Sequence, residues 1–115
     1  MAKYFGFSVA DSMFQGGCVI RRTVLTPEQV RAAAEAGEFI SCLNPSHAAT
    51  IAVMRSRFGI DVVIPAKAPL VKLEHGDSVV VMGVRGLPRL EGRHEYTDEE
   101  IAAATFSFSE YTVIG

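Results

Sequence analysis

The chain has 115 residues and a formal net charge of −2, and 49% of its residues are apolar against 21% charged. This composition excludes a disordered chain and predicts one packed domain over residues 1–115. The acidic balance argues against non-specific binding of long nucleic acids, which requires a broad basic surface. Because a domain of this size hides only about two-thirds of its unfolded surface, dimerisation would stabilise it.

Cysteine content and apolar runs indicate the compartment. Cys18 and Cys42 are isolated, and no Cys-x-x-Cys or comparable ligand spacing is present, so we expect neither a metal site nor a cofactor. Isolated thiols are typical of reduced intracellular proteins. Met1–Phe7 lacks the apolar core of a signal peptide, and the longest apolar run, Val79–Val84, is too short to span a bilayer. The sequence therefore predicts a cytoplasmic protein without a membrane partner.

The first predicted elements are strands. Lys3–Val9 and Cys18–Leu25 are rich in aromatic and β-branched residues, which favour extended structure. A Gly16-Gly17 turn signal lies between them. We therefore expect the two strands to pair as a hairpin.

Helix signals follow. Thr26 is a good N-cap residue, and Gln29 three positions later completes a capping box, so a helix begins here and closes at Gly37. A short strand is expected over Glu38–Leu43. A second helix is expected over about His47–Phe58, because its apolar positions repeat at helical spacing.

Three further strands are expected in the second half of the chain. Ile60–Ile64 and Leu70–Leu73 are short apolar ranges separated by a proline-rich loop. Ser78–Val84 is a nearly continuous apolar run, which is typical of a strand buried on both faces.

The C-terminal part predicts a short helix and a last strand. Thr97 and Glu100 form a second capping-box pattern. After it, Phe106 and Phe108 alternate with serines, as in a half-buried strand. The predicted fold is a small, dimeric α+β domain with a mixed central sheet of about five to six strands and two to three flanking helices.

The stretch NPSHAAT, residues 44–50, is the first candidate site. Asn44 or Ser46 can cap the following helix, which places His47 in its first turn. The unpaired N–H groups of that turn favour an anion such as a phosphate. A histidine beside a bound phosphate can act as a general acid in phosphodiester cleavage. The alternative interpretation is a surface histidine without a ligand.

The loop RGLPRLEGRHEY, residues 85–96, is the second candidate site. Arg85, Arg89 and Arg93 follow the most apolar strand, with Glu91 among them. Arginines in such a loop can bind phosphates through paired N–H groups. The alternative is a solvated loop whose charges maintain solubility.

Two longer stretches resemble the small viral ring nucleases, also known as the type III anti-CRISPR family. FISCLNPSHAATIAVMRSRFGIDV is similar to a family segment in which Gly-His-x-x-Thr opens a helix that ends in glycine; His47, Thr50 and Gly59 match. GDSVVVMGVRGLPRLEGRHEYTDEEI is similar to a segment in which Arg-Leu-x-Glu-Gly follows the most buried strand; Arg89 and Glu91 match. The resemblance extends over most of the chain.

The resemblance implies a homodimer that binds a cyclic oligoadenylate, typically cyclic tetra-adenylate, across its two-fold axis. It further implies metal-independent cleavage, in which the ribose 2′-hydroxyl attacks phosphorus and a histidine protonates the 5′-oxygen. The products would be linear oligoadenylates with a 2′,3′-cyclic phosphate. Such a hydrolase would suppress a host defence in the host cytoplasm.

Site residues follow from the same resemblance. His47 is the general acid, Arg89 stabilises charge on the phosphorane, and Glu91 orients the ribose or the arginine. The ligand-binding positions that the resemblance and the arginine loop indicate are Ser12, Ser46, Thr50, Lys67 and Arg85.

Two departures from the family pattern lie at the ligand. The first strand lacks the asparagine that usually ends it, and Ser46 replaces the glycine before the histidine. They leave open another cyclic nucleotide as the ligand, weaker catalysis, or a non-catalytic protein that binds and sequesters a cyclic nucleotide signal. A third alternative is an interaction or DNA-binding protein with the same fold.

Overall fold

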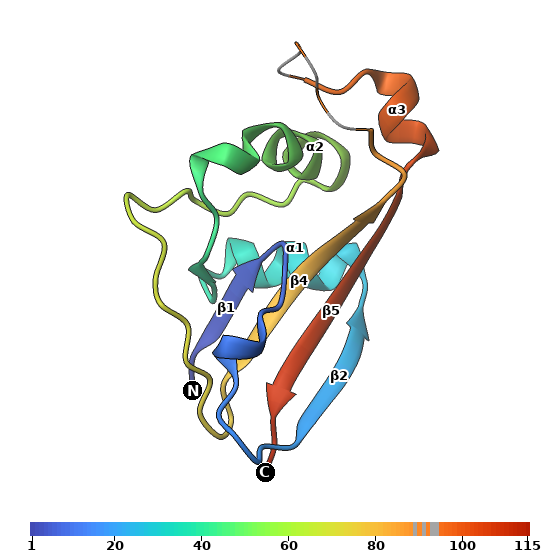
Figure 1. Cartoon of the computed structure of the whole chain (residues 1–115). Coiled ribbons are helices and arrows are strands. Elements are labelled where there is room, and N and C mark those ends of the chain that lie inside the picture. The colour runs from blue at the N-terminus through green and yellow to red at the C-terminus, as the bar shows by residue number, and fades with distance from the viewer. Residues whose placement is uncertain (89, 91, 93–94) are drawn as a thin grey trace.

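A mixed sheet forms the centre of the computed structural model, which describes residues 1–88, 90, 92 and 95–115 (Figure 1). Within these residues five strands form a sheet in the order β2-β5-β4-β1-β3. β1 runs parallel to β3 and β4, and β5 runs antiparallel to β2 and β4. The bounds are β1 Lys3–Gly6, β2 Ile20–Leu25, β3 Ile40–Ser41, β4 Ser78–Arg85 and β5 Thr105–Val113.

The helices begin at capping residues that the sequence predicts. Thr26 Oγ1 accepts a hydrogen bond from Gln29 N at 3.1 Å, and Gln29 Oε1 accepts one from Thr26 N at 2.8 Å. Thr97 and Glu100 form the same reciprocal pair. Gly59 ends the second helix with φ at 67°, a left-handed conformation that favours glycine. The bounds are α1 Pro27–Glu35, α2 Ala48–Phe58 and α3 Asp98–Ala103, with short 3-10 turns η1 Asp11–Met13 and η2 Pro45–His47.

α1 and α2 cover one face of the sheet, which we call the helix face. Val30 of α1 and Met54 of α2 are fully buried and belong to the same core cluster as Phe5 of β1 and Phe108 of β5. These side chains remove apolar surface from water between the helices and the sheet. The predicted α+β architecture is confirmed for the described part of the chain.

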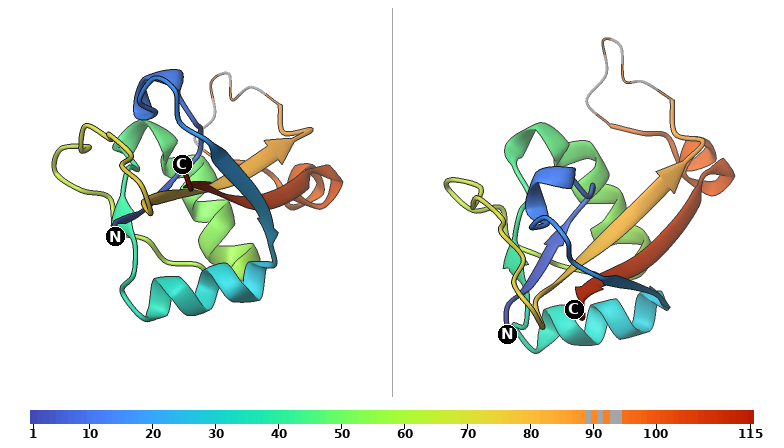
Figure 2. Two further views of the ribbon diagram at one scale, coloured as in Figure 1. Left: turned by 90° about the horizontal axis from the view of Figure 1, so that it is seen from below. Right: turned by 60° about the horizontal axis from the view of Figure 1, so that its bottom comes forward.

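Irregular segments cover part of the opposite face, which we call the open face. The left view of Figure 2 shows η1 and α1 on opposite sides of the sheet. Leu73 and Val113 pack there with Val79 of β4, while Val80 and Met82 of β4 belong to the helix-face core. β4 is therefore buried on both faces along most of its length, as its sequence predicts.

The predicted hairpin between the first two strands is wrong. β2 pairs with β5, from Ile20 opposite Val113 to Leu25 opposite Phe108, at the edge of the sheet away from β3. β1 pairs instead with β3 and β4. The intervening chain crosses the open face, where Phe14 forms an isolated bridge with the 59–77 segment, and so reaches the far edge.

Two predicted strands, Ile60–Ile64 and Leu70–Leu73, are also wrong, since neither range belongs to a described strand. The first range contacts β3 through a side chain, with Ser41 Oγ donating to the carbonyl oxygen of Val63 at 2.5 Å. The second forms an isolated bridge to Phe14. Ile60, Val62, Val71 and Leu73 are buried by packing in the two core clusters and not by a strand ladder, whereas Val63, Ile64 and Leu70 are exposed.

Asp77 holds the N-terminus against the turn that precedes β4. Its Oδ1 accepts a hydrogen bond from Ala2 N at 2.8 Å, and its Oδ2 accepts one from Glu74 N at 3.1 Å. These backbone donors, first Ala2 and then Glu74, lower the pKa of Asp77 below its usual 3.8. The ionised carboxylate therefore stabilises the folded state fully at pH values above its usual pKa. This contribution is lost as the pH falls through the lowered pKa of the folded state.

Asp77→Asn should consequently show a pH-dependent loss of stability. We expect its melting temperature to lie below that of the unmodified chain at neutral pH and the difference to shrink in acid. Thermal unfolding followed by circular dichroism over an acidic pH series measures this difference. Asp61→Asn is the control, because Asp61 forms an exposed ion pair with Arg55 that should contribute little. If the melting temperatures of Asp77→Asn and the unmodified chain differed by the same amount at every pH, the lowered pKa assigned to Asp77 would be contradicted.

Candidate functional site

The sheet topology gathers several predicted site segments at one edge. Because β1, β3 and β4 are parallel, their carboxyl ends lie at the same edge, the upper one in Figure 1. His47 follows β3, and Arg85 is the last residue of β4. The carboxyl ends of parallel strands are where open sheets of this kind hold their ligands.

Asn44 organises the chain between β3 and α2. Its Oδ1 accepts hydrogen bonds from Ser46 N, at 2.9 Å, and from the Ser46 hydroxyl, and its carbonyl oxygen accepts one from His47 N at 3.0 Å. These bonds form η2 and place His47 at the N-cap position of α2. Asn44, one of the two capping residues that the sequence leaves open, therefore caps this short turn. His47 is itself the N-cap residue of α2 and does not lie in its first turn as the sequence predicted.

The His47 ring is half-buried beside an aromatic neighbour. Its centroid lies 5.3 Å from that of Phe7, with the ring planes at 75°. Among the described residues Nδ1 is buried without a hydrogen-bond partner.

Arg85 lines a hollow on the open face. The hollow measures about 400 Å³ and is bounded by Gly83, Val84 and Arg85 of β4 and by Thr105 and Ser107 of β5. A Cβ atom at Gly83 would lie 2.8 Å from Ser107 Oγ, so a larger residue here would require the Ser107 hydroxyl to move. Its described lining contains the residues Arg85, Thr105 and Ser107 and no carboxylate, and a guanidinium with two hydroxyls suits an oxyanion.

The remaining predicted ligand-binding residues are dispersed. Thr50 is half-buried in the first turn of α2, near His47 in sequence, and Ser46 is exposed. Ser12 lies in η1 on the open face, where its carbonyl oxygen accepts a hydrogen bond from Lys72 Nζ at 3.2 Å. Lys67 is exposed in the segment between α2 and β4.

The structure thus brings together Ser46, His47 and Thr50 at the start of α2. Within the described chain, no hydrogen bond or ring contact joins Ser12, Lys67 or Arg85 to His47. Arg85 lies at the same carboxyl edge as His47. Its side chain, however, lies on the open face, because Arg85 is three positions from Met82 along β4 and Met82 faces the helices. Arg89 and Glu91 lie outside the described residues.

Phe7 is the site residue that sequence reasoning missed. It belongs to the predicted first strand, Lys3–Val9, in which the sequence singled out no functional residue. Its contact with His47 joins residues 40 positions apart, so no local pattern could indicate it.

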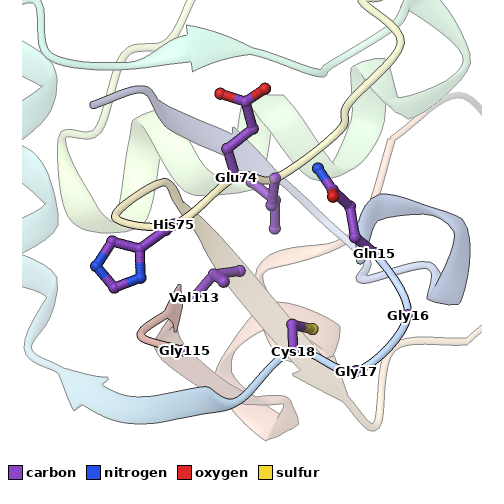
Figure 3. Close-up of a pocket in the computed structure, with 9 residues that line it drawn as sticks. Gln15, Gly16, Gly17, Cys18, Glu74, His75, Val113 and Gly115 are labelled. Carbon is purple, nitrogen blue, oxygen red and sulfur yellow. The ribbon is translucent and has the colours of Figure 1, made fainter.

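A second cavity, of about 380 Å³, lies at the opposite edge of the sheet (Figure 3). Its lining includes Cys18, Glu74 and His75. Figure 3 shows the His75 and Glu74 side chains pointing away from Cys18, so these groups do not converge on one point. Among the described residues no set of three or more His, Cys, Asp or Glu side chains could hold a metal ion.

Fold and site together define a small α+β protein with a mixed sheet, helices α1 and α2 on one face, and a histidine at the carboxyl edge. No protein-family model and no curated protein sequence matches the chain.

A solved structure does match: B116 of Sulfolobus turreted icosahedral virus. The TM-score is 0.71 at 20% sequence identity, over 97% of this chain and 99% of B116. The chain therefore shares its fold with this viral protein over nearly the whole length of both. Within the described residues no helix is long and apolar enough to cross a membrane.

Proposed function

We propose that this chain is a ring nuclease that cleaves a cyclic oligoadenylate second messenger, in particular cyclic tetra-adenylate. The observation that carries the proposal is His47 at the start of α2, with Nδ1 buried and without a partner among the described residues, so that Nε2 is the nitrogen we assign to the ligand. The resemblance of residues 39–62 and 76–101 to viral ring nucleases and the fold shared with a viral protein support it.

The proposed reaction needs no metal ion. The ribose 2′-oxygen attacks the adjacent phosphorus, the bond from phosphorus to the 5′-oxygen breaks, and the 2′-hydroxyl proton passes to water. Protonated His47 gives its Nε2 proton to the departing 5′-oxygen. The products are linear oligoadenylates that end in a 2′,3′-cyclic phosphate.

The proposed roles of the other residues follow the same scheme. Ser46 and Thr50 bind the ligand beside His47, and Arg85 holds a phosphate in the hollow with Thr105. Arg89 stabilises charge on the phosphorane, and Glu91 orients the ribose or the arginine.

Two copies of the chain would bind one ring across a two-fold axis, because a ring of four equal units has matching symmetry. In a homodimer, residues from the helix face of one copy and the open face of the other could meet at one ligand. By removing the messenger in the host cytoplasm, the protein would suppress type III CRISPR or a related nucleotide-signalled defence.

A single-turnover assay tests the proposal. Protein in excess is mixed with labelled cyclic tetra-adenylate in EDTA, with cyclic tri- and hexa-adenylate, cyclic dinucleotides and duplex DNA in parallel reactions. We expect linear products from cyclic tetra-adenylate despite the chelator. Tight binding of a ligand that is recovered intact would instead identify a sequestering protein. Binding of duplex DNA without any small ligand would indicate a DNA-binding protein, and no binding at all would refute the proposal.

A further inference from the structure

The environment of Nδ1 on His47 differs from that of most functional histidines. In such sites a carboxylate or a backbone carbonyl usually accepts the proton of one ring nitrogen and so fixes which nitrogen carries it. Here, among the described residues, Nδ1 is buried without such a partner, and the aromatic ring beside the imidazole is Phe7.

We propose that Phe7 is a positioning residue for His47: its ring holds the imidazole with the proton on Nδ1 and leaves Nε2 facing the ligand. This inference rests on the proposed function, in which Nε2 is the nitrogen that donates. Phe7 touches neither the phosphate nor the leaving oxygen in this scheme and acts through His47.

Phe7 and His47 both lie in anchored segments of the chain. Phe7 follows β1 directly and packs edge to face on the buried Phe5, with ring centroids 6.2 Å apart and planes at 77°. His47 is fixed through its backbone, whose N–H donates to Asn44 O at 3.0 Å. The contact between Phe7 and His47 therefore joins two anchored segments, the end of β1 and η2.

The chemistry of the contact favours the Nδ1–H form. The rings lie edge to face, and the proposal assigns the edge to the imidazole, with Nδ1–H directed at the Phe7 face. An aromatic face is electron-rich and can accept an N–H group as a weak hydrogen-bond acceptor. Nδ1 has no other partner among the described residues, so a bare lone pair would stay unsatisfied, whereas an Nδ1–H group would have the assigned aromatic face as its acceptor. The neutral ring that remains after Nε2 has given up its proton carries hydrogen on Nδ1, which is the form that Phe7 favours.

Nuclear magnetic resonance of the ring nitrogens tests the inference without any substrate. Two-bond proton–nitrogen correlation on ¹⁵N-labelled protein, at a pH where His47 is neutral, distinguishes a protonated nitrogen from a bare one. His47→Ala identifies the His47 signals among the three histidines. Phe7→Leu removes the aromatic ring and keeps an apolar side chain.

Phe39→Leu is the matched control. Phe39 is half-buried like Phe7 and packs on Phe5 with ring centroids 5.2 Å apart. The Phe39→Leu substitution therefore removes an aromatic ring from the same core while the Phe7–His47 pair stays in place. We expect the Nδ1–H form in the unmodified chain and in Phe39→Leu, and a mixture of both forms in Phe7→Leu. An Nε2–H form in the unmodified chain, or an unchanged ratio in Phe7→Leu, would overturn the inference.

Kinetics separate positioning from binding. Phe7→Leu should lower the single-turnover rate on cyclic tetra-adenylate about tenfold and leave ligand affinity within about twofold, because the ring acts only on the donating group. Phe39→Leu should leave both unchanged, and an unchanged rate in Phe7→Leu would count against the inference. If the unmodified chain does not cleave the ligand, the proposed function fails while the nitrogen spectra still decide the role of Phe7.

Discussion

His47→Ala is expected to slow cleavage of cyclic tetra-adenylate by about a hundredfold or more, because general-acid catalysis contributes roughly that factor. The departing 5′-oxygen would then leave without a proton, which is the more difficult path. Single-turnover rates in EDTA measure the loss. Ligand affinity should change less than the rate, since the alanine removes the proton donor while the phosphate contacts assigned to Arg85 and Thr50 stay in place.

His75→Ala is the matched control for this substitution. His75 is exposed and lines the cavity at the opposite edge of the sheet, so its loss should leave the cleavage rate unchanged. Cleavage that survives in His47→Ala, or that falls equally in both variants, would remove His47 from the mechanism. Circular dichroism of both variants checks that the fold is retained.

Phe5→Ala is expected to lower the free energy of unfolding by about 3–5 kcal/mol, as other phenylalanine truncations in cores do. Phe5 is fully buried in β1, and its ring contacts those of Phe7 and Phe39 between the sheet and the helices. Since small domains are stable by only about 5–15 kcal/mol, this loss could leave much of the protein unfolded at physiological temperature. Urea denaturation measures the change.

Val24→Ala provides the comparison for Phe5→Ala. Val24 lies on the edge strand β2 with 67% of its surface exposed, so its truncation should alter stability by no more than about 0.5 kcal/mol. A comparable cost for both substitutions would show that Phe5 does not occupy the centre of the core.

Local sequence signals determined the start of the helices and the burial of the central strand. The capping boxes at Thr26 and Thr97 involve residues three positions apart, and the structure forms both. β4 is apolar at consecutive positions and is buried on both faces. Such features depend on neighbours in the chain, so the sequence by itself is sufficient to predict them.

Only the local part of the candidate site followed from the sequence. Asn44, Ser46 and His47 lie within four consecutive positions, and Asn44, one of the two predicted capping residues, accepts the hydrogen bonds that form the turn before α2. Arg89 and Glu91 stay predictions, because they lie outside the described residues.

Tertiary structure decided the strand pairing and the surroundings of the site. β2 pairs with β5, about 90 residues away, because the chain after β1 crosses the open face of the sheet. The same long-range packing places Phe7 against His47 and puts Arg85 on the face opposite α2. None of these contacts has a local signature, since the free energy that selects them comes from burial summed over the whole core.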